Sequence, residues 1–290
     1  MSISLLSFPA AKNLRLNGVW LGKSKPETLY IFIHGLGGSI FSRAPLTALL
    51  AFGSAAVLAF NNRGSGTINY LKQKKGEKKN YFPAGMAHEV FGDCVDDIDG
   101  AVAYARAQGV KRIFLLGHST GCQKSVYYLA KRPKTAVRGA VLLAPISDYA
   151  DVLKREKKQK YGRALTAAKR LQAQGRFHDL LPASVWPAPL DAQRFLSLYT
   201  AESAEEIFTY ASGKEPKTLL AVKKPILSLL AEDDEFADRP VSEIKMWFEK
   251  KLAAGNKRNQ SAVIKGVGHG FEGGEKETAA LIRLWAKNIK

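Results

Sequence analysis

The chain has 290 residues, of which 46% are hydrophobic, and its 44 Lys and Arg residues against 26 Asp and Glu give a formal net charge of +18. This length and apolar fraction fit one soluble globular domain with a sizeable core and room for an insertion. We expect no membrane span, because no apolar run is long enough to cross a bilayer. The first residues also lack the charged and long apolar regions of a secretory signal, so we expect a cytoplasmic protein.

The chain shows no pattern for a metal, a cofactor or a disulfide framework. Cys94 and Cys122 are too few for a disulfide framework or a four-ligand zinc site, and Cys122 is expected to be a buried, reduced thiol. His88 and His178 are expected to have solvent or cap roles, and no metal-ligand spacing is evident. The positive charge indicates either an anionic partner or a basic, solvated surface. No nucleic-acid partner is expected, because a binding motif is missing and the basic residues are scattered.

The first part of the chain alternates strand patterns with a helix pattern. Strands are predicted at residues 3–8, 14–21, 28–33 and 55–60, with a helix at 44–52. The segment 28–33 is almost entirely apolar, which is typical of a strand buried on both faces of a parallel sheet. A polar loop follows residue 60, and it is expected to be exposed and mobile around Gly76. Its basic residues are Lys72, Lys74, Lys75, Lys78 and Lys79.

The second part continues this alternation and then interrupts it. A helix is predicted where apolar residues recur at helical spacing, at Val95, Ile98, Val102 and Ala105. Further strands are predicted from Ile113 to Gly117 and at 137–144, 225–231 and 260–265. Further helices are predicted to about residue 132, at 241–254 and at 276–289. The eight strands and their helices predict an α/β fold with a doubly wound, mostly parallel sheet.

Between residues 148 and 217 the strand pattern stops. This stretch is helix-like, strongly charged at 154–160 and broken by prolines at 182, 187 and 189. We therefore predict a helical cap at residues 148–217, inserted after the sixth strand of a core that residues 1–147 and 218–290 form.

One apolar strand runs into Gly117-His118-Ser119-Thr120-Gly121, and helix-forming residues follow. Gly-x-Ser-x-Gly between a strand and a helix is typical of a tight turn that exposes a serine hydroxyl above the sheet. Side chains at 117 and 121 would collide with neighbouring backbone, and Ser119 must adopt a strained conformation. The pattern predicts Ser119 as a nucleophile at a helix N-terminus, whose amides favour developing negative charge.

A serine nucleophile needs a base, and the base needs a carboxylate that orients it. His269 is the predicted base, because it lies in a glycine-rich loop after the last predicted strand. The acid is predicted in the cluster after the preceding strand, at Asp233, Asp234 or Asp238. All these positions follow the carboxyl ends of strands, where open α/β sheets place their sites.

Hydrolysis also creates an oxyanion, which needs preorganised hydrogen-bond donors. The amide of Thr120, directly after the nucleophile, is one predicted donor. The amide of Leu36 is the other, in the loop His34-Gly35-Leu36-Gly37-Gly38 after the first buried strand. His34 is expected to hold this loop, and His118 is expected to pack beside the serine.

These motifs together resemble the α/β-hydrolase superfamily of serine hydrolases over nearly the whole chain. The resemblance implies an α/β-hydrolase fold and a catalytic triad of Ser119, Asp234 and His269. It selects Asp234 as the acid, because the acid of the family comes three residues after a small residue, here Ala231.

Two further details refine this resemblance. Residues 117–123, together with Asp234-Glu235-Phe236, are similar to a narrower branch that includes fungal siderophore esterases. Many α/β-hydrolases carry Asp-x-Arg-Gly-x-Gly after the fourth strand, whereas this chain has Asn61-Asn62-Arg63-Gly64-Ser65-Gly66. The geometry of that loop is expected to survive, whereas any role of its acidic residue is lost.

The leading hypothesis for function is a carboxylesterase that cleaves a small-molecule ester through an acyl-enzyme. The same triad would serve a thioesterase, an amidase or peptidase, or a carbon–carbon bond hydrolase, because it does not select the leaving group. A non-catalytic basic binding protein is the alternative from another class.

The cap is expected to cover the serine and to contribute two or three residues to the substrate pocket. Its predicted substrate-binding residues are Trp186, Phe195 and Tyr199. The basic residues of the cap are expected to form a solvated helix face, at Lys154, Arg155, Lys157, Lys158, Lys160 and Arg163.

Overall fold

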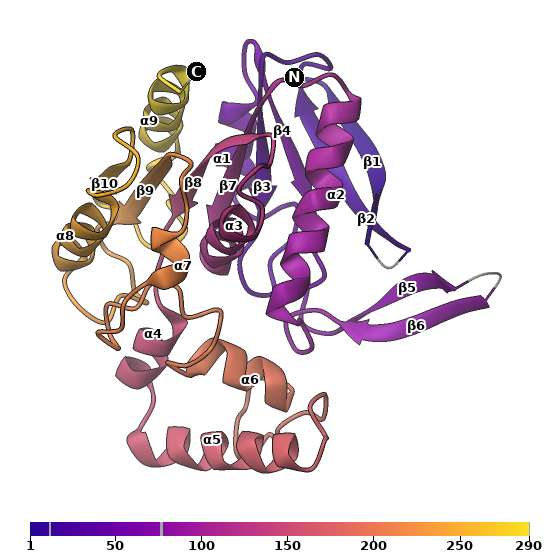
Figure 1. The fold of residues 1–290 in the computed structure, drawn as a ribbon, viewed down its shortest axis with the longest axis vertical. Helices are drawn as coiled ribbons and strands as arrows, with labels where there is room; N and C mark the ends of the chain where they lie inside the picture. The colour runs from indigo at the N-terminus through magenta and orange to yellow at the C-terminus, as the bar shows by residue number, and fades with distance from the viewer. Residues whose placement is uncertain (12, 76–77, 290) are drawn as a thin grey trace.

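The computed structural model describes residues 1–11, 13–75 and 78–289, without the side chains of residues 74–79. Ten strands form one sheet in the order β10-β9-β8-β7-β3-β4-β2-β5-β6, and β1 pairs with β2 beside this path (Figure 1). The strands are β1 (Ile3–Ala10), β2 (Leu14–Gly22), β3 (Thr28–Ile33), β4 (Ala55–Phe60), β5 (Asn69–Lys75), β6 (Lys78–Ala84), β7 (Arg112–His118), β8 (Val137–Leu143), β9 (Ile226–Ala231) and β10 (Gln260–Ile264).

Six neighbouring strands of the sheet run parallel, from β4 through β3, β7, β8 and β9 to β10. β2 lies antiparallel to β4, and β1 lies antiparallel to β2. Every residue of β4 and of β9 is buried, as expected for strands covered on both faces. Because the six strands share one direction, their carboxyl ends meet at one edge of the sheet.

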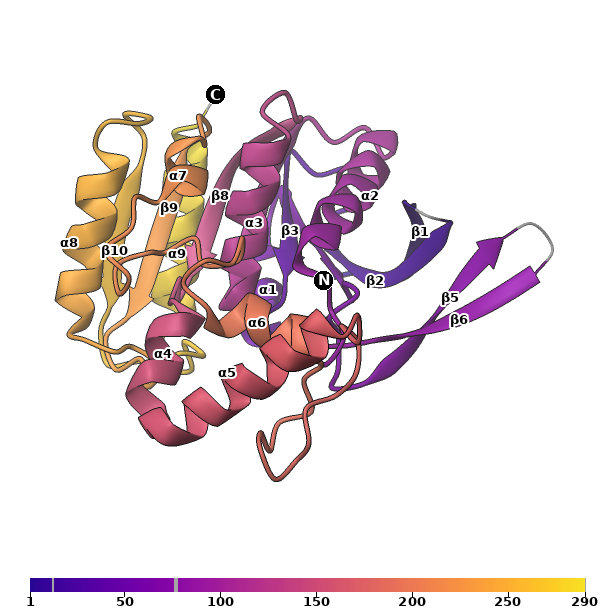
Figure 2. The same ribbon diagram turned by 60° about the horizontal axis from the view of Figure 1, so that its bottom comes forward.

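Helices cover both faces of this sheet, as predicted for a doubly wound fold. α1 and α9 lie on one face, whereas α2, α3 and α8 lie on the other (Figure 2). Their bounds are α1 (Ala44–Leu50), α2 (Cys94–Ala107), α3 (Thr120–Lys131), α4 (Asp148–Arg155), α5 (Lys158–Ala173), α6 (Ala192–Tyr199), α7 (Lys217–Leu220), α8 (Val241–Leu252) and α9 (Glu275–Lys287), with a 3₁₀ turn η1 (Phe91–Asp93). None of the helices in the described ranges has the length and the apolar character that crossing a bilayer requires.

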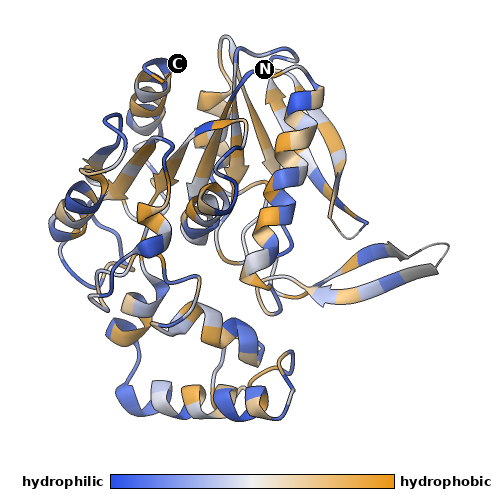
Figure 3. Cartoon of the chain, viewed as in Figure 1, coloured by the Kyte–Doolittle hydropathy of each residue, from blue (hydrophilic) through white to orange (hydrophobic). Residues whose placement is uncertain are grey.

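The two faces of the sheet contribute to two separate hydrophobic cores. Successive residues of one strand point to opposite faces, so Leu115 packs in one core and Leu116 in the other. Figure 3 shows apolar residues concentrated in the central strands. Cys122 and Cys94 are both buried in the core that α2 and α3 cover, and burial raises the pKa of each thiol.

The predicted number of eight strands is wrong, because the segment predicted as a polar loop forms the hairpin β5–β6. Its register places Tyr70 opposite Pro83 and Leu71 opposite Phe82. Aromatic residues favour strands, and here Tyr70, Tyr81 and Phe82 outweigh the lysine-rich composition. Lys72 is exposed, as predicted. The same prediction of an exposed, mobile loop cannot be compared at the other positions, which lie outside the described residues and side chains: Lys74, Lys75, Gly76, Lys78 and Lys79.

The segment 148–217, predicted as the cap, lies between β8 and β9 in the chain. Its helices α4, α5 and α6 lie together beyond one end of the sheet (Figure 1). They share a hydrophobic cluster of their own, in which Val152 of α4, Ala164 of α5 and Phe195 of α6 are buried. Leu36, from the loop after β3, packs partly buried against this cluster. The segment therefore rests on the loops at the carboxyl edge of the sheet.

A buried network of four charged side chains joins this segment to the core. The Lys124 ammonium of α3 lies 2.6 Å from the carboxylate of Glu89, which precedes η1. The Arg194 guanidinium of α6 lies 3.1 Å from Glu89 and 2.5 Å from Glu205. All four side chains are buried, so each charge depends on its partners for compensation.

We predict that Arg194→Met destabilises the protein strongly, because it leaves the buried carboxylate of Glu205 without its cation. The expected loss in the free energy of unfolding is about 3–5 kcal/mol. Arg132→Met is the matched control, since it breaks an exposed pair with Asp99 and should cost less than about 1 kcal/mol. Urea unfolding of both variants measures the difference, and equal losses would contradict the network's role.

Candidate active site

The turn between β7 and α3 holds Ser119 in a strained backbone conformation. Its φ is 54° and its ψ is −128°, which is rare for a residue with a side chain. A Cβ atom at Gly117 would lie 2.3 Å from the carbonyl oxygen of Gly121, and one at Gly121 would lie 2.1 Å from that of Ile33. The turn therefore requires both glycines, and it places Ser119 at the N-terminus of α3.

The loop after β3 passes directly beside the serine. A Cβ atom at Gly35 would lie 2.8 Å from the Cβ and 3.3 Å from the Oγ of Ser119. Leu36 follows and lines the same pocket as Ser119. Within the described part of the chain, neither the amide of Leu36 nor that of Thr120 donates to a backbone carbonyl. This placement suits the predicted pair of oxyanion donors.

The loops after β9 and β10 bring Asp234 and His269 into contact. The Nδ1 atom of His269 lies 3.0 Å and 2.9 Å from the two carboxylate oxygens of Asp234. Asp234 is buried, whereas the alternative Asp233 is exposed and Asp238 pairs with Arg239. Of the three predicted acids, Asp234 is thus the one that orients His269.

Several neighbours fix the position of His269. Its amide donates to Glu235 at 3.0 Å, and its ring and that of Phe236 meet in a T-shaped contact, with 4.7 Å between the ring centroids. The Nε2 atom of His118 lies 2.9 Å from the carbonyl oxygen of His269, and the two rings lie 5.1 Å apart. Burial, together with the neighbouring His269, lowers the pKa of His118 to about 3. A neutral His118 therefore donates Nε2–H and holds the backbone of His269.

His34 stabilises the loop behind the serine, as predicted. Its Nδ1 lies 2.9 Å from the carbonyl oxygen of Gly35, and its Nε2 lies 3.2 Å from the amide of Asn62. Burial lowers the pKa of His34 to about 4, so Nδ1–H donates and Nε2 accepts at neutral pH. In the loop that departs from the family pattern, the Asn61 side chain accepts from the amide of Ile40 at 2.9 Å. The asparagine thus links two loops of the site.

Ser119 and His269 line one pocket of about 290 Å³ at the carboxyl edge of the sheet. The core contributes Arg43 and the loop at Leu36, and the cap segment contributes Asp148, Asp151, Arg155 and Tyr199. Sequence reasoning missed Asp148 and Asp151. Their position just after the carboxyl end of β8 was the available signal, because loops there face the site.

The structure brings one of the three predicted cap residues to this pocket. Tyr199 lines it and also packs in the hydrophobic cluster of segment 148–217, whereas Trp186 and Phe195 belong to that cluster alone. The rings of Trp186 and Phe195 meet edge to face at 5.1 Å, and Phe195 is fully buried. Arg155 is exposed, as expected, and it also lines the pocket and pairs with Asp151. These two aromatic side chains fill the hydrophobic cluster of segment 148–217, so they are not available to line the pocket.

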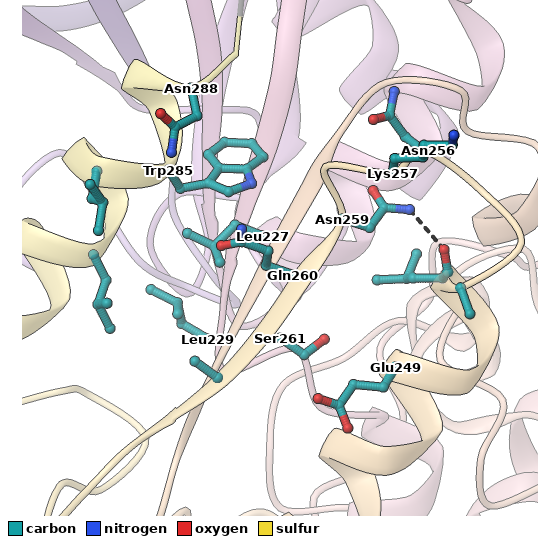
Figure 4. Close-up of a pocket in the computed structure, with 15 residues that line it drawn as sticks. Leu227, Leu229, Glu249, Asn256, Lys257, Asn259, Gln260, Ser261, Trp285 and Asn288 are labelled. Carbon is teal, nitrogen blue, oxygen red and sulfur yellow. Dashed lines mark hydrogen bonds between the residues drawn. The ribbon is translucent and has the colours of Figure 1, made fainter.

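A second cavity lies near the amino ends of β9 and β10, at the opposite end of these strands from Asp234 and His269. It is bounded by α8 and α9, with Glu249, Ser261 and Trp285 in its lining (Figure 4). There the side-chain amide of Asn259 donates to the carbonyl of Leu252 at 3.0 Å. No residue of the predicted triad lines this cavity.

Comparison with models of known protein families assigns the chain to one family. The model of a family described as "Protein of unknown function (DUF1749)" matches residues 86–287, which is more than half of the sequence. The chain belongs to the DUF1749 family. No curated protein matches the sequence.

Solved structures show the fold of this DUF1749 member. The α/β-hydrolase GrgF from Penicillium sp. sh18 is 14% identical, over 100% of this chain and 99% of that chain, with a TM-score of 0.69. The Pyrococcus furiosus esterase PF2001 is 16% identical, over 99% of this chain and 91% of that chain, with a TM-score of 0.59. The esterase RhEst1 from Rhodococcus sp. ECU1013 is 20% identical, over 99% and 100%, with a TM-score of 0.58. The predicted α/β-hydrolase fold is confirmed, whereas the likeness to fungal siderophore esterases stays a prediction.

The two buried imidazoles predict a pH dependence of stability. The folded-state pKa of His34 is about 4, below its unfolded value of about 6.5, so below pH 6.5 the unfolded chain binds a proton that the folded protein excludes. This contribution is fully present above pH 6.5 and is lost as the pH falls toward 4. In this window the free energy of unfolding of the wild type should fall by up to about 1.4 kcal/mol more per pH unit than that of His34→Gln.

The measurement is urea unfolding at several pH values between 4 and 7. Ser119→Ala is the control, because it changes the same site without removing an imidazole, and it should keep the wild-type slope. Identical slopes for the wild type and His34→Gln would show that His34 is not held neutral.

Proposed function

We propose that this protein is a serine esterase that cleaves carboxylic esters of small molecules. The observation that carries the proposal is the 2.9 Å contact between Asp234 and Nδ1 of His269, because His269 lines the same pocket as Ser119. Two of the similar solved structures are esterases, which is consistent with the proposal. At 16% and 20% identity, these similarities support the fold alone.

In the first step, the Ser119 Oγ attacks the ester carbonyl carbon, and Nε2 of His269 takes the hydroxyl proton. The Asp234 carboxylate accepts Nδ1–H, so it holds the tautomer whose Nε2 is a base and stabilises the imidazolium that forms. The carbonyl oxygen becomes an oxyanion. The amides of Leu36 and Thr120 would donate to it, and the N-terminus of α3 favours the same negative charge.

The intermediate then collapses to an acyl-enzyme. The carbon–oxygen bond to the alcohol breaks, and the imidazolium of His269 gives its proton to the leaving oxygen. Water attacks the acyl carbon in the second half of the reaction, with His269 again as the base. Release of the carboxylic acid restores the Ser119 hydroxyl.

The pocket favours small, polar substrates. Its volume of about 290 Å³ is at the lower limit for small-molecule sites. Its walls carry charges, but both cations already have partners, because Arg155 pairs with Asp151 and Arg43 pairs with Glu272. A short acyl group therefore fits better than a long alkyl chain, because burying an alkyl chain against charged groups gains little free energy.

The triad roles can be tested with a fluorophosphonate probe and p-nitrophenyl butyrate. The wild type should be labelled at Ser119 and should hydrolyse the ester. Ser119→Ala should abolish labelling. Asp234→Asn should lower kcat by about three to four orders of magnitude, because the imidazole loses its correct tautomer.

Asp233→Asn is the matched control, since its side chain is exposed and adjacent in sequence, and it should change kcat by less than about twofold. Equal losses in the two aspartate variants would overturn the choice of acid. A panel of thioesters, amides and carbon–carbon substrates distinguishes the other reactions of this triad. Absence of both labelling and turnover would favour a binding protein instead.

The pocket and the cap cluster predict opposite effects for two aromatic substitutions. Tyr199→Ala enlarges the pocket, so the ratio of kcat/KM for p-nitrophenyl octanoate to that for the acetate should rise by about tenfold. Trp186→Ala removes a cap-cluster side chain, so it should lower the unfolding free energy by about 3–5 kcal/mol without changing this ratio. A ratio that rises with Trp186→Ala but not with Tyr199→Ala would reverse these roles.

A further inference from the structure

Three side chains with metal-binding atoms converge outside the Ser119 pocket. The Nδ1 atoms of His88 and His178 lie 3.0 Å and 2.9 Å from one carboxylate oxygen, Oδ2 of Asp191. The three ligand atoms all lie within 4.8 Å of one another. His88 and Asp191 are 103 residues apart in the sequence, so the fold assembles this cluster.

Backbone hydrogen bonds hold the cluster in place. The segment around His178 pairs with the segment around Asp191, because the amide of Gln193 donates to Phe177 and that of Ala192 to Asp179. The amide of Asp191 itself donates to the carbonyl of Ala87 at 2.9 Å, which brings His88 alongside. The three ligands are therefore preorganised, two from the connection between α5 and α6 and one from the segment between β6 and η1.

The charges around Asp191 favour a bound cation. Its side chain is fully buried, and its other oxygen, Oδ1, accepts from the amide of Arg194 at 2.7 Å as the N-cap of α6. Within the described residues, the buried cations Lys124 and Arg194 already pair with the carboxylates of Glu89 and Glu205. Oδ2 of Asp191 thus faces two imidazole nitrogens, both aimed at the same oxygen.

The spacing is close to that of a metal centre. Ligand atoms bound at about 2.0–2.1 Å in a tetrahedral zinc site lie about 3.3–3.4 Å apart. The two Nδ1–Oδ2 distances are 3.0 Å and 2.9 Å, so an opening of about 0.4 Å would admit the ion. His178 is 59% exposed at the side chain, which leaves an open side for a water molecule as the fourth ligand.

We propose that His88, His178 and Asp191 bind one divalent transition-metal ion, of which Zn²⁺ fits this donor set best. Two imidazoles and one carboxylate are ligands that zinc and other first-row ions prefer. The bound ion ties the cap segment to the core. It takes no part in hydrolysis at Ser119, because no residue of the Ser119 pocket lines the cavity beside His88 and His178.

The test uses the full chain, treated with EDTA and dialysed, and ZnCl₂ alone as the probe. Isothermal titration should show one Zn²⁺ per chain for the wild type. His178→Ala removes an exposed ligand, and Asp191→Asn keeps an N-cap acceptor, so both should fold. Each should weaken zinc binding by at least about tenfold, since loss of an outer partner of a metal ligand already costs that much.

His269→Gln is the control. Among the described residues, His269 and Asp234 form another histidine–carboxylate pair to which zinc could bind, and this variant disrupts it. It should keep the wild-type affinity. Zinc at a hundredfold excess over its Kd should also raise the Tm of the wild type by about 5 °C, and that of His178→Ala much less. A wild type that binds no zinc, or a His178→Ala variant that binds and is stabilised like the wild type, would overturn the proposal.

Discussion

The strained turn at Ser119 is the constraint on which the arrangement of the site depends. The carbonyl oxygens of Gly121 and Ile33 lie so close that neither Gly117 nor Gly121 could carry a side chain. Because Gly35 has no side chain, its loop can also approach the serine closely. The amides of Leu36 and Thr120 therefore lie in the same region as the Ser119 hydroxyl. Strain of this kind persists only when surrounding structure holds it, and here the buried strands β3, β7 and β8 do so.

Buried polar groups extend this rigidity outward from the turn. His34 and His118 act as neutral hydrogen-bonding groups, one behind the β3 loop and one on the backbone of His269. Farther out, Lys124 and Arg194 share the carboxylate of Glu89, which lies between the core and the cap segment. These buried histidines and ion pairs bond to fixed protein groups instead of water, so directional contacts as well as apolar packing shape the pocket.

Short-range sequence patterns were sufficient to predict the core of the fold and the strained turn that holds Ser119, because buried strands and tight turns leave local signatures. The segment predicted as the cap was harder to interpret, since an aromatic side chain such as Trp186 looks the same in sequence whether it packs inside or lines a pocket. The hairpin β5–β6 was missed because lysines in an alternating strand resemble a loop. The meeting of His88 with Asp191 had no sequence signal, because it depends on how distant segments dock.

The hairpin has one consequence for behaviour in solution. In the described sheet β6 pairs only with β5, so its outer edge offers backbone groups that could pair with another chain. Pro83 removes one donor from this strand, and the lysines at 72, 74, 75, 78 and 79 give the whole hairpin a strong positive charge. Two copies that approached edge to edge would bring these like charges together. A lysine-rich composition of this kind, which resembles a loop in sequence, disfavours such edge-to-edge pairing.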